Sequence, residues 1–439
     1  MQPSGTSSIC EKLVGRQSMP EDLAIIFAYH FPPENAIGGL RPFRFYKYLS
    51  RLGYRVHVIT PANVSEILGI DAQQIADPFV VRARQGMGWQ TERAIRKFLL
   101  PGVVGSQWAI HAYRAALRLI KANPQYRVTV FSTFPPVGTH VAAYWLARRR
   151  NLPWIADFRD PLADNPVYEH ISPFTKDLYR KLEKIFVRSA DLVIANTDGA
   201  QEVLRQKYPD RADRIELIWN GFDPEDRLQP LPFSSPERKI VAHVGELYGG
   251  RTVSPILFSL RRLIDRGLLS ANQFRVQLTG AIVEGSIPDE KFMAQAVKEG
   301  WAKLDTDRVP QKHAHQIIQT AQALLLIQQQ SVTQVPGKLY EYLQVGRPIL
   351  AFVSENSPVE RILERSGVPY TCIYPSSSQD AIDRSVLEFF QSTRNEVRPN
   401  EWFESEFNAQ NHAAKLSDLI QLANRKRLNS PVLSQLSQD

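Results

Sequence analysis

The sequence predicts an α/β protein made of two doubly wound, Rossmann-like parallel-sheet domains in tandem. Three observations carry this prediction. Short apolar runs of strand length alternate with helical stripes along most of the chain. One polar, proline-rich stretch at residues 229–236 interrupts the alternation. The 439 residues also exceed what one hydrophobic core accommodates.

The first half begins with a continuous apolar run at residues 23–28, which is typical of a strand buried on both faces of a parallel sheet. Phe45 and Leu49 then recur at helical spacing, and Gly53 stands where a helix ends. Residues 54–60 alternate as a second strand and complete a βαβ unit. Further strands of this half are predicted at 129–132, 154–157, 191–195 and 215–219.

The second half restarts the alternation at residues 240–244, after the turn at 220–224 and the linker at 229–236. Its other strands are predicted at 274–278, 323–327, 348–353 and 369–373. The expected domains are therefore a disordered tail at 1–20, an N-terminal domain at 21–225, a C-terminal domain at 226–400, a helix at 401–425 that packs back toward the N-terminal domain, and a disordered tail at 426–439.

The composition, 43% apolar and 22% charged, is that of a folded globular protein. Only Cys10 and Cys372 are present, which excludes a disulfide framework and favours a reducing compartment. The sequence has neither a long uncharged apolar run nor a signal-peptide pattern, so we expect a cytoplasmic protein. A net charge of +8 predicts anionic partners: nucleotide phosphates, an acidic membrane surface or nucleic acid.

Ligands of doubly wound sheets bind beyond the carboxyl ends of the strands, so the strand-to-helix loops are the places to search. One such loop, residues 244–251, follows the first strand of the second half. Gly245 lets the backbone approach a phosphate, and Arg251 adds a bidentate donor for it. The alternative is an ordinary turn with a solvated arginine.

A second loop opens a helix at Pro336 and Gly337. Lys338 and Glu341 are three residues apart and hence on one face of its first turn. A cation there can hold a diphosphate, and a carboxylate can accept hydrogen bonds from ribose hydroxyls. The alternative is a surface ion pair on an exposed helix.

A third segment, residues 154–161, crowds Asp157, Arg159 and Asp160 at the end of a predicted buried strand. Charges in that position are costly unless they are paired or functional, so this is a candidate catalytic cluster. The alternative is a structural Asp–Arg pair.

The fourth loop, Gly38-Gly39, opens the first helix of the first half and only loosely resembles a phosphate-binding loop. A dinucleotide site needs three spaced glycines and an acidic residue after the second strand. The second strand here ends Ile59-Thr60-Pro61, so an NAD site is disfavoured.

Taken in order, these segments resemble the GT-B glycosyltransferases, specifically the glycosyltransferase family 4-like group. The resemblance covers about residues 23–423. It is carried by five segments, which are Gly38-Gly39, 157–161 (DFRDP), 220–223 (NGFD), 245–251 (GELYGGR) and 336–348 (PGKLYEYL…GRP).

The resemblance implies that the two domains face each other across a cleft in which a sugar moves from a nucleotide-diphosphate donor to an acceptor. Arg251 and Lys338 would hold the diphosphate, and Glu341 would hold the ribose. Gly38-Gly39 would lie close to the sugar or the phosphates. Gly245 and Gly337 belong to the donor loops, and Asp157, Arg159 and Asp160 to the catalytic side. The group is typically metal-independent, needs no further cofactor and retains the anomeric configuration.

Two positions depart from the family pattern. The group often carries two glutamates eight positions apart, and the position eight before Glu341 is Thr333, which cannot act as a carboxylate. Many relatives also have a His-Asp pair where this chain has Arg159-Asp160. An arginine can bind phosphates or hydroxyls but cannot cycle a proton at neutral pH.

Two weaker patterns concern metals and membranes. Asp305-Thr306-Asp307 is expected in a polar loop, and His313 and His315 point to different sides of a helix, so no metal site is predicted. Residues 89–121 are basic and interleaved with apolar side chains, tryptophans included. This segment is either a contact to the inner face of the plasma membrane, which suits a lipid-linked acceptor, or a helical pair with a solvated face. No nucleic-acid-binding module is recognised.

The function that these patterns favour is a retaining glycosyltransferase of bacterial polysaccharide or glycolipid biosynthesis, acting on a glycan or lipid-linked acceptor. Two alternatives stay open. One is a nucleotide-sugar epimerase on the same fold, which needs acid and base carboxylates beside the sugar. The other is a non-catalytic nucleotide- or glycan-binding protein.

Overall fold

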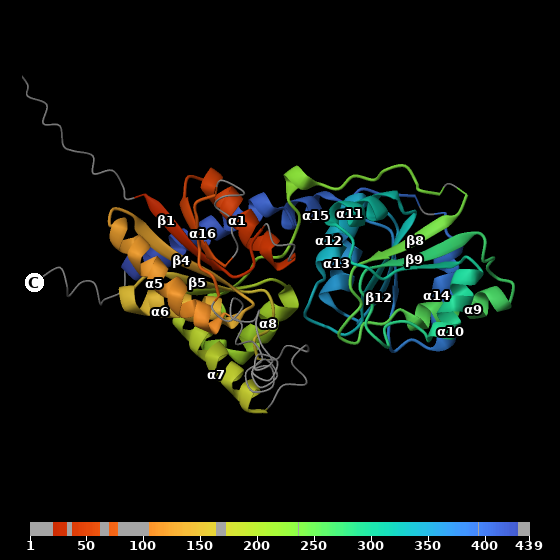
Figure 1. Cartoon of the computed structure of the whole chain (residues 1–439), viewed down its shortest axis with the longest axis horizontal. Coiled ribbons are helices and arrows are strands. Elements are labelled where there is room, and N and C mark those ends of the chain that lie inside the picture. The colour runs from red at the N-terminus through yellow and green to blue at the C-terminus, as the bar shows by residue number, and fades with distance from the viewer. Residues whose placement is uncertain are drawn as a thin grey trace, which may run out of the picture.

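A computed structural model describes residues 21–32, 37–61, 70–77, 105–163, 173–235, 237–393 and 395–428. It contains two parallel sheets, one of seven strands and one of six, each covered by helices on both faces. Figure 1 shows the two α/β units side by side along the longest axis of the molecule. The predicted fold class is confirmed.

The N-terminal sheet has the order β3-β2-β1-β4-β5-β6-β7, with every pair parallel. Its central strands β1, β4 and β5 are buried along almost their whole length, because helices cover both faces. The strands are β1 (Asp22–Ala28), β2 (Arg55–Thr60), β3 (Ala72–Gln74), β4 (Arg127–Phe134), β5 (Trp154–Phe158), β6 (Leu192–Ala195) and β7 (Ile215–Leu217).

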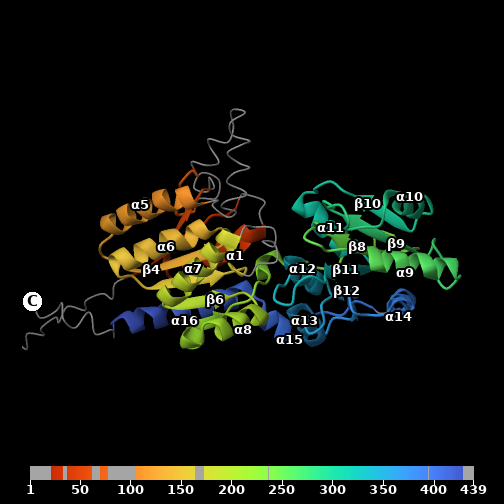
Figure 2. The ribbon, with the colours of Figure 1, turned by 90° about the horizontal axis from the view of Figure 1, so that it is seen from below.

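Helices cover this sheet from both sides (Figure 2). One face packs on α5 and α6 around the buried rings of Trp108 and Trp154, and the other packs on α1 and α16. The helices of this unit are α1 (Leu40–Arg51), α5 (Ser106–Ala122), α6 (Val137–Arg150), α7 (Pro173–Ser189), α8 (Asp198–Lys207) and, returning from the C-terminus, α16 (Ala409–Leu428).

The C-terminal sheet has the order β10-β9-β8-β11-β12-β13, again all parallel. Its strands are β8 (Lys239–Val244), β9 (Phe274–Thr279), β10 (Ala302–Asp305), β11 (Ala323–Gln328), β12 (Ile349–Val353) and β13 (Tyr370–Ile373). Its helices are α9 (Ser254–Asp265), α10 (Glu290–Lys298), α11 (Gln311–Thr320), α12 (Gly337–Val345), α13 (Pro358–Ser366), α14 (Gln379–Gln391) and α15 (Glu401–Glu406).

The sequence patterns missed two strands, β3 and β10, which both lie at a sheet edge. Edge strands bury less surface, and these two read Ala-Gln-Gln and Ala-Lys-Leu-Asp, without an apolar run. The prediction that Asp305 lies in a polar loop is wrong, since it is the last residue of β10. The helix expected at 401–425 is two helices, α15 and α16, and the second continues to Leu428.

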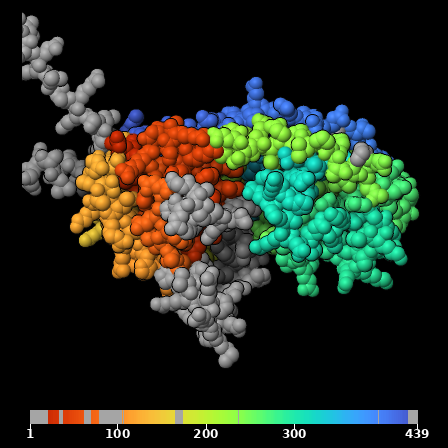
Figure 3. Space-filling model, turned by 45° about the horizontal axis from the view of Figure 1, so that its top comes forward, coloured from red at the N-terminus to blue at the C-terminus, as the bar shows by residue number. Residues whose placement is uncertain are grey.

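The chain crosses between the two units twice, at residues 218–226 and 406–409. The N–H of Phe222 donates to the carbonyl of Phe407 at 2.9 Å, and Phe222 pairs with Asn408. A Cβ on Gly221 would lie 1.9 Å from the same carbonyl oxygen, so only glycine lets the two segments approach this closely. In Figure 3 the light green segment after this crossing and the blue C-terminal part of the chain run along the same side of the molecule.

Candidate functional site

The loop after β8, residues 245–251, is held by backbone contacts on both sides. The N–H of Gly245 donates to the carbonyl of Thr279 at 2.9 Å, and Gly280 approaches so closely that a Cβ there would lie 2.4 Å from the Gly245 oxygen. The carbonyl of Gly250 accepts hydrogen bonds from Gln329 and Gln330 at 3.1 and 3.0 Å. The loop is therefore preorganised at the carboxyl edge of the sheet, where ligands of such folds bind.

Arg251 ends this loop with its guanidinium carbon 4.6 Å from the centre of the Tyr248 ring, a cation–π contact. The side chain is half-buried. Among the residues that the structure describes, no carboxylate forms an ion pair with it. Its charge is consequently available to an anion.

Lys338 and Glu341 lie on the first turn of α12, with Lys338 Nζ 3.0 Å from Glu341 Oε2. His315 of α11 approaches the same carboxylate, Nε2 to Oε1 at 3.6 Å. Burial opposes ionisation, but His315 and Lys338 together hold the pKa of Glu341 below its usual range. Behind them, the Tyr342 hydroxyl accepts the N–H of Val244 at 3.0 Å and ties α12 to the end of β8.

Lys338 and Gly245 belong to one site, and the positive charges of Arg251 and Lys338 both act on His243 beside it. Lys338 borders the space beside Gly245, because a Cβ there would lie 3.8 Å from its Cγ and Cε atoms. Gly245 has a φ of +145°, a conformation that side-chain-bearing residues rarely adopt. A flexible cation, a planar cation and an open backbone face suit a diphosphate group.

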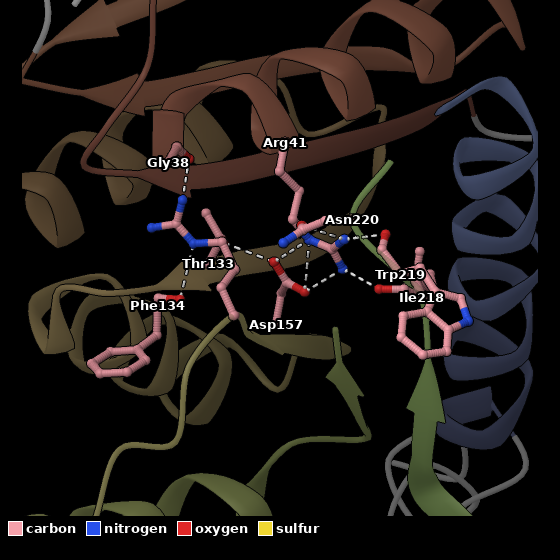
Figure 4. Close-up of polar contacts among 9 residues, drawn as sticks. Gly38, Arg41, Thr133, Phe134, Asp157, Ile218, Trp219 and Asn220 are labelled. Atoms are coloured by element: carbon pink, nitrogen blue, oxygen red, sulfur yellow. Dashed lines mark hydrogen bonds and ion pairs between the residues drawn. The ribbon is translucent and has the colours of Figure 1, made fainter. Parts of the chain in front are cut away.

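The facing unit contributes the charged cluster at the end of β5 (Figure 4). Asp157 is fully buried and pairs with Arg41, whose Nη2 lies 2.8 Å from Oδ1. It also accepts the Thr133 hydroxyl at 2.8 Å. Arg159 is buried and donates to the carbonyls of Phe134 at 3.0 Å and of Gly38. The alternative expectation of a structural Asp–Arg pair holds for Asp157, but its partner is Arg41.

Arg159 has a direct effect on the Gly38-Gly39 loop. It donates to the Gly38 oxygen, and a Cβ at Gly38 would lie 2.7 Å from its Nη1. A Cβ at Gly39 would lie 3.0 Å from the backbone of Phe31. A side chain at Gly39 would press against fixed backbone, whereas one at Gly38 would have to displace the Arg159 guanidinium. The loop forms the 3-10 turn η1 (Ile37–Gly39) in front of α1.

Three polar contacts join the two units beside this cluster. Gln334 Nε2 donates to Asp160 Oδ1 at 2.9 Å. The Thr197 hydroxyl donates to the carbonyl of Thr333 at 2.5 Å. Arg361 on α13 holds Asp198 at the start of α8 with Nη2 to Oδ2 at 2.8 Å. Thr333 lacks the carboxylate that many relatives carry at this position. It contacts the facing unit through its backbone carbonyl instead.

Sequence reasoning missed Arg41, Gln334 and the Asp198–Arg361 pair. These residues are bound by contacts between segments more than a hundred residues apart, for which no local pattern exists. Arg41 stands two residues after Gly39, and that position is its only signal in the sequence.

The basic segment is described only in part, since residues 89–104 lie outside the described residues. Trp108 is fully buried against Phe27 and Tyr29, so its predicted membrane contact is wrong. The cations of α5 are exposed, namely Arg114, Arg118 and Lys121. Within the described ranges, no helix is long and apolar enough to cross a membrane, and no cluster of acidic, histidine and cysteine side chains could hold a metal ion.

Comparisons with known proteins give the family of part of the chain and the fold of the whole. The profile of Glycosyltransferase Family 4 matches residues 43–226, from α1 to the first crossing between the units. This stretch is a glycosyltransferase family 4 domain. The chain is accordingly a glycosyltransferase, with that domain on the side of Asp157 and Arg159. A sequence search of curated proteins found no match.

Solved glycosyltransferases share the arrangement of both units, which is the GT-B fold. Sucrose-phosphate synthase of Thermosynechococcus elongatus is 12% identical with a TM-score of 0.62, covering 92% of this chain and 100% of that one. A UDP-forming α,α-trehalose-phosphate synthase of Burkholderia vietnamiensis is 10% identical with a TM-score of 0.60, covering 92% and 100%. HepE of Anabaena, solved with UDP, is 14% identical with a TM-score of 0.52, covering 95% and 100%.

Proposed function

We propose that this family 4 glycosyltransferase binds a nucleoside-diphosphate sugar at the carboxyl edge of the C-terminal sheet and transfers the sugar with retention of configuration. One observation carries the proposal. The side chain of Lys338 borders the open face of Gly245, and the positive charges of Lys338 and Arg251 both act on His243 beside it, so two cations lie near a backbone face that suits a diphosphate. UDP is the first nucleotide to test, because two structural neighbours are described as forming or binding it.

Each donor-side residue has a distinct task in this proposal. Arg251 and Lys338 neutralise the charge that develops on the departing diphosphate, an electrostatic stabilisation that needs no proton transfer. Glu341 exchanges its contact with Lys338 for the ribose hydroxyls, and its lowered pKa keeps it an acceptor at neutral pH.

The residues of the facing unit divide into positioning and contact roles. Asp157 is fully buried with both oxygens bound, so we assign it the positioning of Arg41. Arg159 positions the Gly38-Gly39 loop, which then faces the sugar or the phosphates. Asp160 is only partly buried and reaches Gln334 of the donor unit, so it is the carboxylate placed to accept sugar or acceptor hydroxyls.

We further propose that the acceptor is a glycan or a lipid-linked molecule, in polysaccharide or glycolipid biosynthesis at the cytoplasmic face of the membrane. The exposed cations of α5 and the triple Arg148-Arg149-Arg150 at the end of the adjacent α6 support an anionic surface as partner. Because Trp108 is buried, it is not available to insert into a membrane, and we attribute binding to such a surface to the charges.

Proton NMR of the purified enzyme with UDP-glucose, alone and with candidate acceptors, tests the function. A glycosyltransferase releases UDP, slowly with water and faster with an acceptor, and the new bond keeps the donor's anomeric configuration. An epimerase instead converts the sugar while it stays on the nucleotide. Binding with neither change in any nucleotide sugar tried would support the non-catalytic alternative and overturn the proposal.

A further inference from the structure

His243 is a buried polar residue at the carboxyl end of β8, directly behind the loop that starts at Gly245. The residue is 7% exposed. Nδ1 lies 3.0 Å from the carbonyl oxygen of Leu325, so Nδ1 carries a proton and donates it there. In the neutral ring Nε2 is then an acceptor, and among the described residues it has no hydrogen-bond partner. A buried polar atom left without a partner costs free energy and calls for a functional explanation.

Nε2 borders the same space as Lys338. A Cβ built on Gly245 would lie 4.0 Å from His243 Nε2 and 3.8 Å from the Cγ and Cε atoms of Lys338. Glycine leaves this space open, and its positive φ of +145° opposes any side chain there. The opening is thus bounded by an ammonium-bearing chain and an unpartnered imidazole nitrogen.

The charges around the ring favour its neutral form while the space holds no anion. Burial lowers the pKa of His243 to about 4, and the positive charges of Arg251 and Lys338 add to this effect, while hydrogen bonding to the backbone of Leu325 and Gly245 opposes it. Tyr342 of α12 is turned to the Val244 N–H, and Glu341 is paired with Lys338. A diphosphate would shift the balance toward the charged ring, because its negative charge offsets the two cations and one of its oxygens would accept a hydrogen bond from Nε2–H.

We propose that His243 is a third phosphate-binding group, which takes up one proton when the donor diphosphate binds. The proton passes from solvent to Nε2, and Nε2–H then donates to a phosphate oxygen while Nδ1–H stays on Leu325. This inference rests on the proposed donor site. His243 is neutral when the donor site is empty and positively charged when the site holds the diphosphate, so donor affinity depends on pH. The affinity rises as the pH falls through the pKa that His243 has in the bound state.

Isothermal titration calorimetry of the full chain with UDP-glucose tests this directly. This diphosphate diester has no proton of its own to exchange near neutral pH, so buffers of different ionisation enthalpy report protons taken up by the protein. The expected result at pH 7 is uptake approaching one proton per bound ligand. If UDP-glucose does not bind, the glucose ester of whichever nucleoside diphosphate stabilises the protein replaces it.

Two variants assign the proton. His243→Gln should abolish the uptake and weaken binding about tenfold. His315→Gln should leave the uptake in place, although His315 lies near Glu341. Binding without proton uptake in the wild type, or uptake that His315→Gln removes, overturns the role of His243 and leaves the donor site intact. Failure of every nucleoside diphosphate to bind overturns both.

The wild-type measurement does not depend on the variants. If His243→Gln fails to fold, the wild-type affinity measured from pH 8 to pH 6 gives the same answer. It should strengthen as the pH falls, and a flat profile contradicts the proposal.

Discussion

Arg41 holds Asp157 through two guanidinium nitrogens, Nε to Oδ2 at 3.0 Å and Nη2 to Oδ1 at 2.8 Å. The same guanidinium donates to the carbonyls of Ile218 at 2.8 Å and Trp219 at 2.6 Å, in the segment that crosses between the units. Arg41 therefore joins the first helix, the end of β5 and the crossing segment (Figure 4). Because Arg41 stands two residues after Gly39, we expect a displacement of the crossing segment to displace the Gly38-Gly39 loop as well.

Arg41→Met should destabilise the protein strongly. Removing one partner of a buried ion pair leaves an uncompensated charge, which costs about 3–5 kcal/mol. Asp157 is fully buried and would be that charge. Urea unfolding of the wild type and the variant measures the difference. Arg51→Ala is the matched control on the same helix, since its ion pair with Glu225 is exposed, and it should barely move the midpoint. Equal effects of both variants would contradict the role of Arg41.

Asp160→Asn should separate stability from activity. Burial raises the pKa of Asp160, although Arg159 and Gln334 oppose this. A carboxyl group whose pKa is higher in the folded state than in the unfolded state lowers the free energy of unfolding at every pH where the group is ionised. Stability is thus lost as the pH rises from the ordinary Asp value through the raised one. Asparagine keeps an oxygen for Gln334 and removes that loss.

We expect the melting temperature of Asp160→Asn at pH 7 to match or exceed that of the wild type, while the transfer rate falls about 100-fold or more. Thermal unfolding and a donor-turnover assay are the two measurements. A variant of full activity would show that Asp160 only joins the units through Gln334.

Periodicity predicted the fold because both faces of each sheet are covered, so central strands such as β1 and β11 are continuous apolar runs. It failed at β3 and β10, whose edge positions impose no such pattern. It also merged α15 and α16, because Phe403, Phe407 and Ala409 are all buried and carry the apolar pattern across the break.

The donor loops could be found from sequence because their glycines, Lys338 and Glu341 follow one another within single turns. The role of Asp157 could not be found, since its partner Arg41 is 116 residues away. His243 is the penultimate residue of the strand predicted at 240–244, and a polar side chain in that apolar run is a signal for a functional residue.

Glu341→Gln should weaken recognition of ribose specifically. If the carboxylate accepts ribose hydroxyls, the wild type binds UDP more tightly than 2′-deoxy-UDP, by about tenfold. The variant should lose most of that difference, because an amide accepts through one oxygen only. Calorimetric titration with both nucleotides measures it. Glu364→Gln, an exposed carboxylate on α13, should keep the full difference. An unchanged ratio in Glu341→Gln would remove Glu341 from the ribose site.

The basic face of α5 predicts binding to anionic vesicles. Replacing Arg114, Arg118 and Lys121 with glutamate should abolish sedimentation with phosphatidylserine-containing vesicles at low salt, since each basic residue near such a surface contributes about 1 kcal/mol. The control carries the same charge change at Arg266, Lys291 and Lys298, exposed cations of the C-terminal unit. Equal loss in both triple variants would indicate that only net charge matters.

The donor site is the central claim, and thermal stabilisation of the purified protein by UDP, GDP, ADP, TDP and CMP tests it most directly. A ligand that binds only the folded state must raise the melting temperature. We predict that one nucleoside diphosphate does so. Arg251→Ala should weaken its binding roughly 10- to 100-fold, the loss of a charged hydrogen bond. Arg308→Ala, whose exposed side chain pairs with Glu246 in the same loop, should respond as the wild type does. No stabilisation by any of these nucleotides at millimolar concentration, or equal stabilisation of Arg251→Ala and the wild type, would contradict the account.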